Sequence, residues 1–492
     1  MTGTPGDAAG AVASVAPAPA PAADPAPDPA TTRRRVLVVT LDTIADRMAG
    51  PAIRAWEISR ALAPEHDVRL VTFGRCTRPG EGFEARHIGV GDFRAEVDAS
   101  DVVVVQGFVF NAFDWLQTVE QVLVVDLYDP FQLETLEVDR YKPTDERHRA
   151  LAFALGELSL QVRRGDLFLC ASRRQRDLWI GHLAAAGRIN PETYDSDPSL
   201  ASLITIVPFG TSAEPPRQER RAIKGATPGI AETDKVVLWG GGVYNWFDPL
   251  TLVHAVDRVS RTVPEVRLYF LGMKHPNPDV PEMAVATRTR ELSDELGLTG
   301  RHVFFNEDWV AYERRADHLL DADVGVSCHF PHVETEFSFR TRILDYLWTG
   351  LPIVTTAGDS FAELVAARGL GRVVPPEDPD ALADALEELL VDRDGAATAA
   401  RDAVREVAPE FTWPVVLAPL VEFCRAPRRA ADAARIAAER EAAASGSGAP
   451  RPGVRALAGA ARRDVGAAVR HLRAGGVRQV VAKVRWRLAR RR

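Results

Sequence analysis

The sequence predicts an α/β fold made of two consecutive Rossmann-like halves, each a doubly wound parallel sheet. Three observations lead to this prediction. Short, continuous apolar runs of the kind found in buried parallel strands recur along the 492-residue chain. Stretches with helical periodicity separate these runs, as in a doubly wound sheet. A polar segment rich in Pro, Glu and Arg, residues 210–233, interrupts the pattern, which then starts again.

The first half begins with the continuous apolar run of residues 36–40. The segment 51–62 follows with the pattern of a helix, and Pro51 stands where the first turn tolerates proline. Further strands are expected at residues 68–73, 101–106, 122–126, 166–171 and 203–207. We therefore expect a first domain over residues 33–212 and a linker over residues 213–233.

The second half begins with the apolar run of residues 235–239 and the triple glycine Gly240–Gly242. Asp248 as N-cap with proline at the next position predicts a helix start. Further strands are expected at residues 267–271, 302–305, 324–327, 352–355 and 372–374. We expect the second domain to cover residues 234–412.

The composition, 46% apolar and 26% charged residues, is that of an ordinary soluble protein with enough material for sizeable cores. It excludes a wholly disordered, collagen-like or integral-membrane chain, and no apolar run has the length of about 18 residues that a membrane span needs. The scattered cysteines include no Cys-x-x-Cys, which disfavours a disulfide framework or structural zinc and favours a reducing cytoplasm.

The two ends differ from the body of the chain. Residues 1–32 are almost entirely Ala, Pro, Gly, Thr and Asp, which predicts a disordered arm and no secretory signal. Residues 451–492 hold 13 Lys/Arg and one Asp, a net charge of +12, which leaves −20 on the first 450 residues. The acidic body argues against nucleic-acid binding. The Ala/Arg-rich tail, residues 429–492, has amphipathic stripes that favour binding to an anionic membrane surface. The alternative is a disordered basic tail. We therefore expect a cytoplasmic protein that lies peripherally on the inner face of the cell membrane.

Ligands of open parallel sheets bind beyond the carboxyl ends of the strands, so the loops there are the candidate site. The loop 41–50 ends in Ala-Gly-Pro, with Gly50 at a helix start that could bind an anion or could be a plain turn. Gly241 and Gly242 follow the first strand of the second half, in a loop suited to a diphosphate. Neither a GxGxxG fingerprint nor a Walker motif is present.

The segment 334–354 combines a polar loop with a predicted helix over residues 340–349. On that helix Arg342, Asp345 and Tyr346 fall on the arc opposite to the apolar residues. A carboxylate can accept hydrogen bonds from a ribose diol and an arginine can neutralise phosphate, although ion pairing on a solvated face would also explain Arg342 and Asp345. The whole polar loop between the strand 324–327 and this helix holds His329, His332, Glu334 and Glu336, but without a helical zinc motif a metal site is not expected.

At these residues the sequence resembles a GT-B-fold glycosyltransferase of family 4, the retaining nucleotide-sugar transferases, in a bacterial form. The resemblance covers residues 33–424. Its motifs read Ala49-Gly-Pro, Arg60-Ala-Leu-Ala and His66-Asp-Val in the first half, and Asp345-Tyr-Leu-Trp-Thr-Gly-Leu-Pro-Ile-Val, Gly358, Glu363 and Phe411-Thr-Trp in the second. In this fold the segment 413–428 would be a helix that returns to the first domain.

The resemblance also implies roles for individual residues. Asp345 matches the second glutamate of the family's Glu-x7-Glu motif and would hold the ribose, while Glu336, one position from the first glutamate, would contact the donor sugar. Asp129, at a strand end, is the nearest polar candidate for the family's acceptor-domain histidine. The usual Arg and Lys are absent from residues 240–247, and the candidate replacements and further nucleotide-binding residues are Lys274, Arg340, Arg342 and Glu363.

The function implied is transfer of a sugar from a UDP- or GDP-sugar to a lipid-linked or polysaccharide acceptor in cell-envelope glycan synthesis. The resemblance implies retention of configuration and neither a metal nor another cofactor, so that helix N-termini, loop amides and arginine would stabilise the leaving diphosphate. Two alternatives stay open. One is a non-catalytic GT-B-like binding or scaffold protein, and the other is a GT-B sugar-nucleotide epimerase.

Overall fold

The computed structural model describes residues 33–273, 282–307 and 309–445. Its first domain contains a seven-stranded sheet in the order β3-β2-β1-β4-β5-β6-β7, in which neighbouring strands are parallel. The strands are β1 (Arg35–Thr40), β2 (Asp67–Thr72), β3 (Glu84–His87), β4 (Val102–Gln106), β5 (Val122–Asp126), β6 (Leu167–Cys170) and β7 (Ile204–Ile206). The helices are α1 (Gly50–Leu62), α2 (Phe93–Asp98), the 3₁₀-helix η2 (Asp114–Thr118), α3 (Phe131–Val138), α4 (Thr144–Arg164), α5 (Arg173–Ala185) and α6 (Pro191–Ser196).

The second domain is a six-stranded parallel sheet in the order β10-β9-β8-β11-β12-β13. Its strands are β8 (Lys235–Trp239), β9 (Val266–Phe270), β10 (Val303–Phe305), β11 (Val324–Ser327), β12 (Ile353–Thr356) and β13 (Gly371–Val374). Its helices are α7 (Pro249–Val259), α8 (Ala284–Glu295), η3 (Tyr312–Arg314), α9 (Arg315–Leu319), α10 (Val333–Phe337), α11 (Arg342–Thr349), α12 (Ser360–Arg368), α13 (Pro379–Leu390), η4 (Arg393–Gly395) and α14 (Ala396–Val407).

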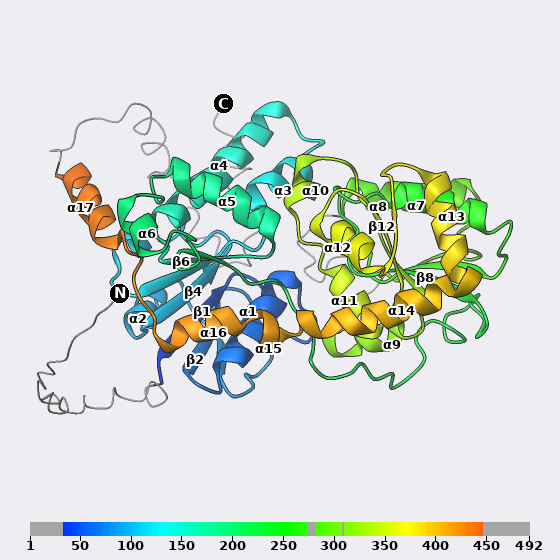
Figure 1. Cartoon of the computed structure of the whole chain (residues 1–492), viewed down its shortest axis with the longest axis horizontal. Helices are drawn as coiled ribbons and strands as arrows, with labels where there is room; N and C mark the ends of the chain where they lie inside the picture. The colour runs from blue at the N-terminus through cyan, green and yellow to red at the C-terminus, as the bar shows by residue number, and fades with distance from the viewer. Residues whose placement is uncertain (1–32, 274–281, 308, 446–492) are drawn as a thin grey trace, which may run out of the picture. The chain divides into compact units, whose positions relative to one another are not determined.

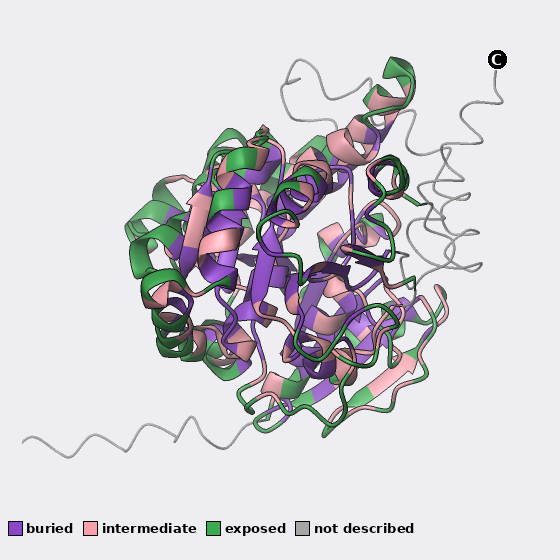
Figure 2. Cartoon of the chain, turned by 90° about the vertical axis from the view of Figure 1, so that its right-hand side faces the viewer, coloured by how far each residue is buried: buried purple, intermediate pink, exposed green. Residues whose placement is uncertain are grey.

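Both sheets are buried on both faces, as the continuous apolar strands require. All five residues of β4 are buried, and Figure 2 shows buried strands inside helices with exposed outer faces. Alternate residues of β1 pack into different cores, Val36 and Val38 with α1 and Leu37 and Val39 with α4 and α5. The core that contains α1 continues into the second domain through apolar residues of α11 and α14.

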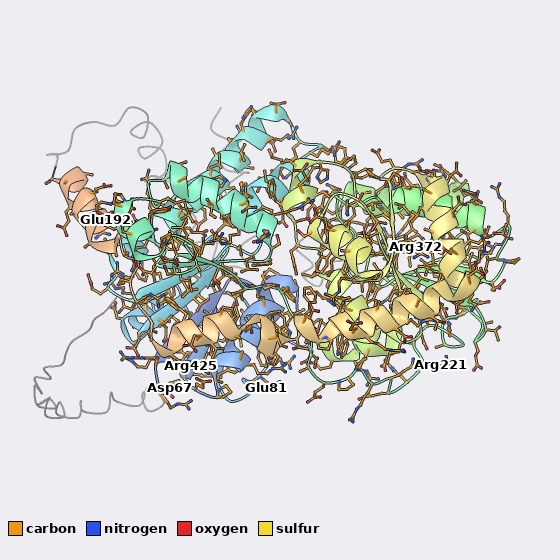
Figure 3. All side chains as sticks on the ribbon, viewed as in Figure 1. Asp67, Glu81, Glu192, Arg221, Arg372 and Arg425 are labelled. Carbon is orange, nitrogen blue, oxygen red and sulfur yellow. The ribbon has the colours of Figure 1, made fainter. Side chains whose placement is uncertain are left out.

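The chain returns to the first domain after α14 through η5 (Ala408–Phe411), α15 (Trp413–Val416) and α16 (Ala418–Arg425). Trp413 is buried against Phe209, with ring centroids 4.8 Å apart, and Thr211 pairs with Thr412. Arg425 of α16, labelled in Figure 3, forms an ion pair with Glu65 at 2.6 Å. These contacts place α15 and α16 on the first domain.

Residues 429–445, grouped with the basic tail in the sequence analysis, also lie against the first domain. Asp432 is buried and pairs with Arg188 at 2.8 Å, and the helix α17 (Ala433–Ala444) follows (Figure 1). The described part of this segment is therefore folded, because a buried ion pair holds its start. The predicted N-terminal arm and residues 446–492 lie outside the described residues.

The structure confirms the predicted strands to within one or two residues at each end. The strand β3 was not predicted, because this short edge strand has only intermediate or exposed residues and no apolar signal. It was also wrong to treat all of residues 328–339 as loop, because α10 lies there with the His332 side chain as its N-cap. In the described ranges no helix is long and apolar enough to cross a membrane.

Candidate functional site

A cleft of about 330 Å³ lies where the carboxyl-end loops of the two sheets face each other. The first domain contributes the N-terminal turn of α1, the loop after β5 and Phe209–Gly210. The second contributes the glycine loop after β8, the segment 309–315 and the start of α11. Of the predicted site residues, the cleft brings together Gly50, Asp129, Gly241, Gly242, Arg340, Arg342 and Asp345.

Two backbone features of the cleft suit an anionic ligand. Gly241 has φ +78°, a left-handed conformation that L side chains rarely adopt, so the loop depends on glycine there. On the opposite side Ala49 precedes α1 without a side-chain cap, so the first turn of this helix faces the cleft with no capping oxygen. The positive end of the helix dipole therefore points to the same space as the glycine loop.

Arg342 is a buried cation without a carboxylate partner among the described residues. Its guanidinium lies 4.2 Å from the ring centroid of Trp239 and 3.9 Å from that of Phe247. Nη2 donates to the Gly242 carbonyl at 2.9 Å, whereas Nη1 is buried with no acceptor. Burial lowers the pKa of Arg342 to about 10, which leaves it charged at neutral pH. An unpaired buried arginine beside a glycine loop is poised for an anion such as phosphate.

The helical arc that the sequence analysis assigned to polar residues is largely buried. Tyr346 is fully buried, and its hydroxyl lies 2.8 Å from the Gly240 nitrogen, which donates to it. The same hydroxyl lies 3.0 Å from the Leu238 carbonyl oxygen and 2.8 Å from that of Val326. Tyr346 thus joins β8, β11 and the glycine loop. The solvated-face alternative, which paired Arg342 with Asp345, does not hold for Arg342, because this side chain is buried and Asp345 pairs with Arg315.

Asp345 is half-buried at the cleft and is oriented by Arg315. Arg315 Nε donates to Asp345 Oδ1 at 2.9 Å, and Arg315 Nη1 donates to the Tyr312 carbonyl at 2.7 Å. The Arg315 guanidinium lies over the rings of Tyr312 and Trp348, at 3.9 Å and 4.4 Å from the centroids. A carboxylate has about four acceptor positions, so Asp345 keeps capacity for a ligand hydroxyl while Arg315 fixes its orientation.

We expect Asp345→Asn to raise the dissociation constant of a nucleotide ligand roughly ten- to a hundredfold, because one charge-assisted hydrogen bond is worth about 1.5–3 kcal/mol. Arg315 also loses its carboxylate partner, so a moderate fall in thermal stability should accompany the effect. Calorimetric titration with a nucleotide measures the first and thermal unfolding the second. Asp402→Asn, which changes an exposed carboxylate of α14 outside the cleft lining, is the matched control. Unchanged nucleotide affinity in Asp345→Asn would contradict this role.

The structure places the other predicted residues differently. Arg340 lines the cleft, but its guanidinium is committed to Glu334 through two hydrogen bonds of 3.1 and 2.8 Å. Glu336 and Glu363 are exposed and are not among the residues that line the cleft, and Lys274 lies outside the described residues. Asp129 is at the cleft with Tyr128 and Glu134 from the same loop and helix α3.

The segment that carries Glu336 and Glu363 contacts helix α5 of the first domain. Arg174 pairs with Glu363 and donates to the Gly358 carbonyl at 2.6 Å, while Gln175 Nε2 donates to the Phe337 carbonyl at 2.9 Å. Gln175 Nε2 also donates to the carbonyl of Tyr128, which lines the cleft, so these contacts connect the two domains beside it. Sequence reasoning missed Arg174, Gln175 and Arg315 because they lie far along the chain from their partners and match no local motif.

His332 and His329 serve structural roles in the described part of the chain. The His332 Nδ1 accepts from the Thr335 amide at 3.3 Å as the N-cap of α10, and His329 lies 3.5 Å from Asp359. No group of three or more His, Cys, Asp or Glu side chains within the described ranges could hold a metal ion.

The comparisons with known proteins agree with this architecture. Residues 234–392 match the family model described as glycosyl transferases group 1, which covers Arg342, Asp345 and the glycine loop. No curated protein matches the chain. Sucrose-phosphate synthase from Thermosynechococcus elongatus is similar in structure, with TM-score 0.55 and 16% identity over 80% of this chain and 98% of that chain.

Two further structures are similar. WaaG, a glycosyltransferase involved in lipopolysaccharide biosynthesis, has TM-score 0.52 and 17% identity over 81% of this chain and 98% of its own. Anabaena HepE in complex with UDP and glucose has TM-score 0.54 and 15% identity over 79% of this chain and 99% of its own. The fold is GT-B. Together with the family match, these findings support a GT-B glycosyltransferase whose group 1 domain holds most of the cleft's polar side chains.

Proposed function

We propose that the protein transfers a sugar from a nucleoside-diphosphate sugar, a UDP- or GDP-sugar, to a lipid-linked or polysaccharide acceptor of the cell envelope. The observation that carries the donor proposal is Arg342, a buried guanidinium with an unpartnered Nη1 beside the glycine loop. A diphosphate supplies the negative charge and the acceptor oxygens that this group lacks. HepE in complex with UDP and glucose is a structural neighbour and supports the same class of donor.

In the proposed reaction each cleft element has a separate task. Arg342, the amides of the glycine loop and the N-terminus of α1 stabilise the charge that develops on the leaving diphosphate. Asp345, oriented by Arg315, accepts hydrogen bonds from the ribose. Asp129 is a carboxylate that the first domain presents to the cleft, on the side where an acceptor would meet the sugar. Glu336 is proposed to help position the donor sugar, and the outcome is proposed to be retention of configuration, as in the resembled family.

Nucleotide-sugar binding and turnover test the proposal. Thermal shift against a panel of UDP- and GDP-sugars should identify the donor, because a ligand at a hundredfold excess over its Kd stabilises by about 2.7 kcal/mol. Nucleoside diphosphate released only with an acceptor supports the transferase. Binding without turnover would favour a scaffold protein, and conversion of the donor without acceptor would favour an epimerase.

We expect transfer to continue in saturating chelator, because arginine, loop amides and a helix dipole are proposed to carry the charge that a metal ion carries in other transferases. The measurement is nucleoside-diphosphate release with and without EDTA, with a metal-dependent transferase as the control. A reversible loss of activity restored by Mg²⁺ or Mn²⁺ would contradict this account of leaving-group stabilisation.

We also propose that residues 451–492, outside the described residues, bind an anionic membrane surface. Each Lys or Arg near an anionic leaflet contributes about 1 kcal/mol, so a fraction of the 13 present would hold the protein there. Deletion of residues 451–492 should move the protein from the membrane pellet to the supernatant and weaken salt-sensitive flotation with anionic liposomes. Equal flotation of the truncated and full chains would show that the tail is not the membrane anchor.

A further inference from the structure

A second cavity, of about 370 Å³, lies in the first domain at a different place from the cleft. Its walls are the C-terminal end of α4, the chain from the end of η2 to Glu120, and the segment from Arg429 through α17. Figure 1 shows α17 at the end of the molecule opposite to the second domain. The volume is within the range of about 300–1,000 Å³ typical of small-molecule sites.

The lining of this cavity carries a surplus of positive charge. Five arginines and two acids, Glu120 and Asp166, line it. The arginines are Arg163, Arg164, Arg188, Arg429 and Arg440. Asp166 is already saturated, because it accepts from Arg164 and Arg429 at 2.7 and 2.9 Å and from two backbone amides. Its charge is shared by two guanidiniums, and Arg188 is paired with the buried Asp432, so Arg163 and Arg440 remain without a carboxylate partner among the described residues.

Three guanidinium groups keep hydrogen-bonding capacity. Arg163 is exposed and has no hydrogen-bond or ion-pair partner in the described part of the chain. Arg440 donates to the carbonyl of Gln117 and pairs with no carboxylate among the described residues. Arg164 is 4% exposed, and its Nε is buried without an acceptor. Such donors in a partly enclosed space favour an anion that can accept several hydrogen bonds at once.

The remaining wall is apolar. It is formed by Ala433, Ala434, Ile436 and Ala437, which lie on α17. Small side chains leave room beside the arginines for an uncharged organic group. The cavity therefore offers one cationic side and one apolar side.

We propose that this cavity binds a phosphate ester, with the phosphate on Arg163, Arg164 and Arg440 and the uncharged part of the ester along the alanine face of α17. The ligand comes either from a soluble phosphate ester or from the headgroup of an anionic lipid, since both present the same phosphate chemistry. Because α17 forms one wall, the bound ester fixes this helix on the first domain. The site is independent of the proposed nucleotide-sugar cleft.

The test uses the full chain and the double variant Arg163→Gln/Arg440→Gln, which removes two charges at the cavity. Arg94→Gln/Arg140→Gln removes two exposed charges elsewhere on the first domain and is the matched control. Glycerol 3-phosphate is titrated by calorimetry, and flotation is measured with phosphatidylcholine vesicles with and without phosphatidylglycerol. UDP-glucose thermal shift of all three chains reports the cleft separately.

If the source is soluble, wild type and control bind glycerol 3-phosphate and the cavity variant binds it roughly ten- to a hundredfold more weakly. If the source is a lipid headgroup, glycerol 3-phosphate does not bind and the cavity variant floats less than the control with phosphatidylglycerol vesicles. If the cavity variant matches wild type and control in both measurements, the proposal is overturned. The UDP-glucose thermal shift reports only on the cleft. A result that is equal in all three chains therefore bears on the proposed donor site and not on this cavity.

Discussion

Replacing Arg342 by methionine should abolish measurable nucleotide-sugar binding while leaving the unliganded protein as stable as wild type or more stable. The affinity should fall by roughly a hundredfold or more, because a guanidinium forms at least two charge-assisted hydrogen bonds with a diphosphate. Methionine keeps the apolar contact with Trp239 and Phe247 and removes a charge that is buried without a carboxylate. Removing the cost of burying this charge offsets the lost hydrogen bond to Gly242. The nucleotide-sugar affinity should therefore fall while the stability of the unliganded protein stays the same or rises.

Calorimetric titration and chemical denaturation of the same preparation measure both effects. Arg258→Met, at an exposed arginine of α7 paired with surface acids, is the matched control and should change neither affinity nor cleft chemistry. A structural role of Arg342 would give the reverse pattern, a large loss of stability with affinity retained. That result would remove the main support for the donor proposal.

Replacing Tyr346 by phenylalanine should destabilise the second domain by about 2–4 kcal/mol, although only one oxygen atom is lost. Without the hydroxyl, the Gly240 amide loses its acceptor, and the carbonyl oxygens of Leu238 and Val326 lose the single O–H proton that they share inside the core. An unsatisfied buried backbone group costs about 1–3 kcal/mol, and the loss falls on the loop that faces the proposed diphosphate. Nucleotide affinity should therefore also fall.

Urea denaturation followed by tryptophan fluorescence measures the stability, and Tyr194→Phe supplies the control, since this side chain is 54% exposed. Equal denaturation midpoints for wild type and Tyr346→Phe would mean that the three backbone groups find other partners. The glycine loop would then be stable without Tyr346, and its geometry would have another cause.

Contacts that join the domains flank the cleft on two sides, and this bears on how donor and acceptor meet. On one side Arg78 of the first domain pairs with Glu313 at 2.5 Å, two residues from the Arg315 that orients Asp345. On the other side Arg174 and Gln175 contact the segments around Phe337 and Gly358. The geometry of Asp345 thus depends on a segment that the first domain also contacts.

Local sequence patterns were enough to predict the fold class and many of the residues that line the cleft. Continuous apolar strands such as residues 102–106 predict a sheet covered on both faces, and the restart at residue 235 predicts two such sheets. The helix starts at Gly50 and Asp248 follow from proline and N-cap chemistry, which acts within a few residues. Because parallel strands end at one edge, the positions of Gly241, Arg342 and Asp345 in one cleft followed from their places after strands.

Long-range packing, in contrast, sets which of these polar groups can contact a ligand and which stabilise the fold. Helical periodicity put Arg342 and Tyr346 on one polar arc, but packing against β8 and β11 buries both, Tyr346 in backbone hydrogen bonds and Arg342 with an unpartnered nitrogen. Arg340 was predicted to bind phosphate, but its guanidinium pairs with Glu334. A charged side chain can pair with a residue tens to hundreds of positions away, as Arg315 does with Asp345 and Arg188 with Asp432. No local sequence pattern identifies such a partner.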